Sequence, residues 1–77
     1  MRELVEEIAK ALVDHPESVQ VSTIQGTRVT VFELRVHPED LGKVIGRQGR
    51  TVKAIRALLS AAGAKLHMQF TVVVLDN

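Results

Sequence analysis

Hydrophobic positions near the N-terminus recur with the period of an α-helix. Between residues 2 and 13, apolar side chains lie on one helical face and charged side chains on the opposite face. The apolar face consists of Leu4, Val5, Ile8, Ala9 and Leu12. Pro16 ends this helix because proline has no amide hydrogen and biases the preceding His15 toward extended geometry.

Residues 19 to 36 alternate between apolar and polar side chains, which is typical of β-strands. The alternation is interrupted at Gly26-Thr27, and a two-residue turn there predicts a hairpin in which Gln25 faces Arg28. The core face of this hairpin then contains Val19, Val21, Thr23, Thr30, Phe32, Leu34 and Val36. The opposite face is mixed and groups three apolar residues near the turn: Ile24, Val29 and Val31.

Two helices and a strand are predicted in the second half of the chain. Pro38 fits the first position of a short helix of about two turns. A longer helix runs from a glycine turn to about Ala62, with Gly63 as its C-terminal cap. Its buried stripe contains Val52, Ile55, Leu59 and Ala62. Residues 66 to 75 alternate again, which predicts a strand with inward-facing Leu66, Met68, Phe70, Val72 and Val74.

The predicted order is helix, strand, strand, helix, helix, strand. A right-handed crossover through the helix pair favours a last strand parallel to the second strand. We therefore expect an α+β fold, with a three-stranded mixed sheet covered on one face by three helices. The 77 residues allow a single domain, spanning residues 1–77, with a small core.

Composition excludes several classes of protein. The chain has no cysteine, which excludes disulfides, cysteine-based zinc sites and thiol catalysis, and fits a reducing compartment. No apolar run is long enough to span a membrane, and the N-terminus does not resemble a signal peptide. We expect a cytoplasmic protein.

The net charge of +1 conceals an uneven distribution of charge. Residues 1–40 contain four cationic and eight acidic side chains, whereas residues 41–75 contain six cationic side chains and no acidic one. Such a polarised chain can present a basic surface to a polyanion.

A four-residue turn, Gly46-Arg47-Gln48-Gly49, lies between the two predicted helices of the basic half. Glycine allows positive φ angles and close approach of another chain, and a helix that starts there exposes unpaired N–H groups. Five cations flank or occupy the turn: Lys43, Arg47, Arg50, Lys53 and Arg56. The combination predicts a phosphate-binding turn.

The run Val44-Ile45-Gly46-Arg47-Gln48-Gly49, followed by Val52 and Ile55, resembles the signature of the KH domain, an RNA-binding module. The stretches 12–17 and 38–43 extend this resemblance to the small single-domain bacterial KH proteins of the KhpA family. The resemblance implies the type II KH fold and a role as an RNA chaperone or post-transcriptional regulator. It also implies a homodimer, or a heterodimer with a larger KH-containing protein.

The predicted site would hold about four nucleotides of single-stranded RNA. Glycines would permit close approach, N–H groups from Arg47 to Arg50 would donate to phosphate, and aliphatic side chains, with Val36 as a further candidate, would line the base-binding groove. The predicted RNA-binding residues are Lys43, Val44, Ile45, Gly46, Arg47, Gln48, Gly49, Arg50, Val52, Lys53 and Arg56.

Other functions have weaker support in the sequence. A protein interaction module with an incidental basic groove is the alternative, and Ile24, Val29, Val31 and residues 61–64 are candidate contact surfaces for a dimer. No arrangement of residues resembles a catalytic triad or a carboxylate pair, so we expect neither an enzyme nor a cofactor. His15, His37 and His67 are scattered along the chain, so we expect no metal site.

Overall fold

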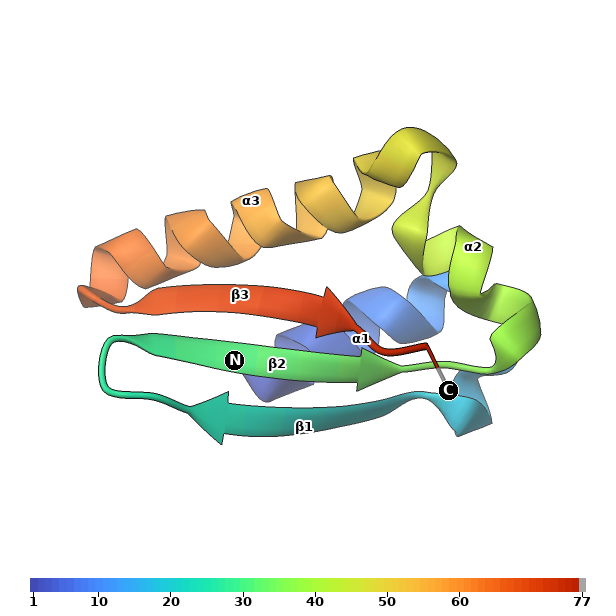
Figure 1. Cartoon of the computed structure of the whole chain (residues 1–77), viewed down its shortest axis with the longest axis horizontal. Helices are drawn as coiled ribbons and strands as arrows, with labels where there is room; N and C mark the ends of the chain where they lie inside the picture. The colour runs from blue at the N-terminus through green and yellow to red at the C-terminus, as the bar shows by residue number, and fades with distance from the viewer. Residues whose placement is uncertain (77) are drawn as a thin grey trace.

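A computed structural model describes residues 1–76 and shows the predicted order of elements (Figure 1). The helices are α1 (Arg2–Leu12), α2 (Leu41–Ile45) and α3 (Arg50–Leu66). The strands are β1 (Gln20–Gln25), β2 (Val29–Arg35) and β3 (Gln69–Val74). Short 3₁₀ turns, η1 (Pro16–Ser18), η2 (Pro38–Asp40) and η3 (Arg47–Gly49), precede β1, α2 and α3.

The three strands form one mixed sheet in the order β1-β2-β3. Strands β1 and β2 are antiparallel, whereas β2 and β3 are parallel, as predicted. The buried strand residues Thr30, Phe32, Leu34, Phe70 and Val72 all belong to one face of the sheet. They pack with Val5 and Ala9 of α1 and with α3, so the helices cover that single face (Figure 1). The predicted α+β fold is confirmed.

The predicted hairpin register is wrong by two residues. Gln25 pairs with Thr30 rather than with Arg28, and the two-residue turn is Thr27-Arg28. The Gly26 N–H closes this turn by donating to the Val29 carbonyl at 2.9 Å. A Cβ on Gly26 would lie only 2.8 Å from that same oxygen, so glycine is needed beside the turn. A shift by two residues keeps every side chain on its predicted face, which is why the hydrophobic pattern did not reveal it.

The C-terminal end of α3 also differs from the prediction. The helix continues past Gly63 to Leu66, and His67 is the residue that takes the left-handed conformation, with φ of 56°. The Met68 N–H donates to the Gly63 carbonyl at 2.8 Å, which closes the helix end as a Schellman motif. Strand β3 consequently starts at Gln69, and Leu66 and Met68 are exposed rather than inward.

Helix α1 buries a narrower stripe than predicted. Val5 and Ala9 are buried, but Leu4 and Leu12, at the margins of the predicted face, are exposed. A helix of three turns that crosses a three-stranded sheet contacts it only along a central line.

Among residues 1–76, no helix is both long and apolar enough to cross a membrane.

Candidate nucleic-acid interface

The turn between α2 and α3 uses conformations that favour glycine. Gly46 and Gly49 have φ angles of 78° and 75°, and Gln48 between them has φ of 57°. A Cβ on Gly46 would overlap the side chain of Thr51, whereas the space around Gly49 is open apart from Lys53 Cε at 3.8 Å. Gly46 is therefore required both by its φ angle and by its packing, and Gly49 by its φ angle.

Two of the four N–H groups predicted to bind phosphate are used within the turn. The Gly49 N–H donates to the Gly46 carbonyl at 3.1 Å, and the Arg50 N–H donates to the Arg47 carbonyl. Within residues 1–76, the N–H groups of Arg47 and Gln48 are the two of these four that have no backbone acceptor in the turn. They stand at the N-terminal end of the 17-residue helix α3, where the helix dipole also favours negative charge.

Three of the five predicted cations surround the turn without acidic partners. Arg47, Arg50 and Lys53 are exposed, and within residues 1–76 none of them takes part in an ion pair. Their charges are therefore not neutralised by the protein itself. The local field at the turn is positive, as the sequence predicted.

The other two predicted cations contact the protein. Lys43 pairs with Asp14 and lies 3.5 Å from Asp40 Oδ1, and the hydrogen bond to Asp14 raises the pKa of the Lys43 ammonium. Arg56 Nε donates to the Val72 carbonyl of β3 at 3.0 Å. An RNA phosphate would have to compete with these contacts for either side chain.

The aliphatic residues next to the turn are mostly part of the core. Val44 is fully buried, and Val36 and Val52 are also buried, so their side chains support α2 and α3 from beneath. Ile45 is half-buried and presents the apolar surface that remains beside the turn. The side chains of Val36, Val44 and Val52, which the sequence predicted to line a groove for bases, thus lie in the core.

Asp40 is an unexpected buried carboxylate at the start of α2. It accepts hydrogen bonds from the backbone N–H of His15 at 2.9 Å and from His15 Nδ1 at 3.0 Å. Burial alone would raise the pKa of Asp40. The hydrogen bonds from His15, together with a hydrogen bond from the Asp14 backbone, outweigh the effect of burial and lower the pKa to about 2. The bond to Asp40 conversely raises the pKa of His15.

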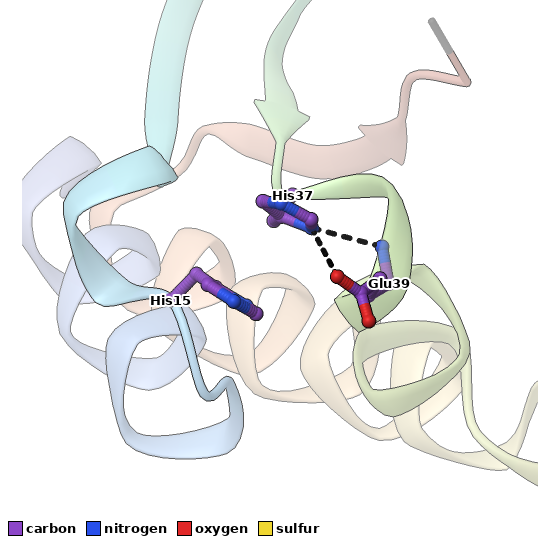
Figure 2. A group of neighbouring side chains, drawn as sticks. All are labelled: His15, His37 and Glu39. Carbon is purple, nitrogen blue, oxygen red and sulfur yellow. Dashed lines mark hydrogen bonds and ion pairs between the residues drawn. The ribbon is translucent and has the colours of Figure 1, made fainter.

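The fold also brings together two histidines that the sequence analysis treated as scattered. The rings of His15 and His37 stack with their centroids 4.0 Å apart and their planes at 16°. His37 Nδ1 accepts a hydrogen bond from the Glu39 N–H at 3.1 Å (Figure 2). No local spacing could reveal this group, because it forms only when the start of η2 meets the loop after α1.

Comparison with known proteins identifies the family. Residues 2–74 match the sequence profile of the family described as "KhpA/KhpB, KH domain". The chain belongs to this KH-domain family. Among relatives in the family, the RNA-binding protein KhpA of Clostridium perfringens is 51% identical over 75 residues, which cover 97% of this chain and 100% of the relative. KhpA of Aquifex aeolicus is 43% identical over 76 residues, covering 99% of this chain and 96% of that protein. The resemblance drawn from the glycine turn is confirmed.

Proposed function

We propose that this KH domain binds single-stranded RNA without catalysing a reaction and seats the phosphate backbone on the turn from Gly46 to Gly49. The observation that carries the proposal is the turn itself, where positive φ angles, open N–H groups and three unpaired cations coincide. The KhpA relatives, which are named RNA-binding proteins, support the same reading.

Each part of the turn has a distinct role in this mechanism. The N–H groups of Arg47 and Gln48 donate to phosphate oxygens, and Gly46 and Gly49 let the RNA backbone approach. Arg47, Arg50 and Lys53 neutralise the phosphates, and Ile45 offers an apolar contact to a base.

Binding by this site should be weak and only modestly selective. The chain has no Trp or Tyr, and its two Phe residues, Phe32 and Phe70, are buried. It therefore lacks the base stacking on exposed Trp, Tyr or Phe that contributes roughly 1 to 3 kcal/mol per base in many single-strand binders. Weak, tolerant binding in the cytoplasm suits an RNA chaperone or post-transcriptional regulator.

The dependence of RNA affinity on salt tests this mechanism. If only the three unpaired cations displace counterions, the logarithm of the binding constant should fall against the logarithm of salt concentration with a slope of roughly −2. If Lys43 and Arg56 also released their protein partners to bind phosphate, the slope should approach roughly −3.5. Fluorescence anisotropy of a short labelled RNA at several salt concentrations measures this slope.

Matched variants of α3 provide the control for this titration. Lys53→Gln should make the slope shallower by roughly 0.7, whereas Lys65→Gln, near the other end of the same helix, should leave it unchanged. A slope close to zero in the parent protein would contradict the phosphate-binding mechanism.

A surface at the opposite end of the molecule supports a second role, in protein association. Leu58 and Leu66 of α3 are 57% and 56% exposed, and Ile24, Val29 and Met68 are also exposed. A groove of about 490 Å³ lies between the end of α3 and the start of β3, lined by Val29, Ser60, Ala64, Met68, Gln69, Phe70 and Thr71. We propose that this end contacts a second copy of the chain or a larger KH-containing protein.

Self-association can be measured by analytical ultracentrifugation. We expect a dimer at protein concentrations of about 100 μM, the weak end of specific association. Leu66→Glu, on the exposed surface near the end of α3, should shift the protein to monomer, whereas Leu4→Glu, on α1, should not. A monomeric parent at this concentration would contradict the homodimer.

A further inference from the structure

We propose that His15, His37 and Glu39 form a binding site for a divalent transition-metal ion of the Zn²⁺ type. Each residue offers one ligand atom, and the three ligand atoms all lie within 4.8 Å of one another. They come from two segments: His15 lies in the loop after α1, whereas His37 and Glu39 lie at the start of η2 (Figure 2). Two imidazoles and a carboxylate, with water in the fourth position, are a common ligand set for zinc.

His15 is already oriented as a metal ligand. Its Nδ1 lies 3.0 Å from Asp40 Oδ2, and its side chain is 36% exposed while that of Asp40 is 1% exposed. In the neutral ring, Nδ1–H then donates to the buried carboxylate, which leaves the Nε2 lone pair free for a metal. Metal-ligating histidines usually have such an outer carboxylate, which sets the tautomer and makes the ligand nitrogen more basic.

Glu39 is the most exposed member of the group. Its side chain is 78% exposed, and its Oε1 lies 3.9 Å from His37 Nδ1. Typical bond lengths to zinc are about 2.0–2.2 Å for both nitrogen and carboxylate oxygen, so two ligand atoms on one ion lie roughly 3.3 Å apart in a tetrahedral site. The present separation of 3.9 Å is somewhat longer than this, so the carboxylate has to move closer when the ion binds.

His37 has to turn before the ion can bind. Nitrogen lone pairs lie in the ring plane, and the two stacked rings, at 16° to each other, cannot both point at one ion. The His37 side chain is 33% exposed, and its Nδ1 is held by local contacts with Glu39, chiefly the hydrogen bond from the Glu39 N–H. The metal would therefore replace the ring stack and link the loop after α1 to η2, at the base of α2.

Zn²⁺ alone, added to the untagged full chain, tests the site. We expect a rise in Tm of roughly 4 °C or more at saturation, because the ion binds the folded state. In ¹H–¹⁵N NMR spectra the largest shifts should map to His15, His37 and Glu39. Mg²⁺, which prefers oxygen ligands, should have little effect.

Substitutions of the proposed ligands complete the test. His37→Gln and Glu39→Gln should each weaken Zn²⁺ binding at least tenfold. His67→Asn is the matched control, because residue 67 lies outside the ligand group. Asparagine also tolerates the left-handed conformation that this residue has. The proposal is overturned if the parent shows no shift with Zn²⁺, if the shifts map elsewhere, or if His67→Asn weakens binding as much as His37→Gln. The NMR map of the parent decides the matter even if a variant fails to fold.

Discussion

The double substitution Arg47→Asp with Gln48→Asp should lower the affinity for single-stranded RNA at least tenfold, about 1.4 kcal/mol or more. It removes one unpaired cation and places two carboxylates where the proposed mechanism seats a phosphate. Both residues are exposed, so no core contact is lost. Acidic side chains next to the start of α3 also complement its dipole, so the domain should stay folded.

Circular dichroism and thermal melting check the fold, while fluorescence anisotropy measures RNA affinity. The matched control is Thr27→Asp with Arg28→Asp, which changes the net charge equally but lies in the hairpin turn, at the other end of the molecule (Figure 1). The control should lose much less affinity. If the Arg47 and Gln48 variant is folded and binds RNA like the parent, the glycine turn is only a connection between helices.

The substitution Gly63→Ala should destabilise the domain, although alanine is the better helix former. Gly63 is buried near the end of α3, where an added Cβ would overlap the Met68 carbonyl oxygen and lie 3.3 Å from the Phe70 ring. The overlap is with backbone, so α3 and β3 must move apart. We expect a loss of about 1 to 3 kcal/mol of unfolding free energy, as is typical of overpacking.

Gly42→Ala is the internal control, because it makes the same chemical change in α2. Nothing lies within 4 Å of an added Cβ at Gly42, so this variant should gain about 0.5 to 1 kcal/mol from helix propensity. Since 1 kcal/mol shifts the Tm of a domain of this size by roughly 4 to 8 °C, thermal melting separates the two variants clearly. A stabilised Gly63→Ala variant would contradict the close packing of α3 on β3.

Residues whose placement depends on local rules could be predicted from the sequence. Alternation identified the buried face of β2, because Phe32 and Leu34 follow the two-residue period of a strand. A shift of the hairpin register by two residues leaves this period unchanged. Alternation therefore could not show that the turn consists of Thr27-Arg28, after Gly26. Gly63 was predicted to be a helix cap from its residue type, but its role depends on Met68 and Phe70, which approach only in the folded chain.

In the candidate site, too, some features follow from local rules and others depend on the folded chain. The glycine turn was predictable because positive φ angles restrict residue type, and Gly46 and Gly49 have such angles. The partners of Lys43 and Arg56 were not predictable, because Asp14 and Val72 lie far away in the sequence. The burial of Asp40 likewise depends on His15, which reaches it from a separate segment.

The bonds from His15 to Asp40 mean that the glycine turn is not a self-contained motif. All the predicted RNA-binding residues lie within one short stretch of chain, yet α2, which leads into the turn, is fixed at its start by the loop after α1. An excised helix-turn-helix peptide would retain every one of those residues and lose this anchor. In this protein the first fifteen residues therefore help to determine the direction in which the turn faces.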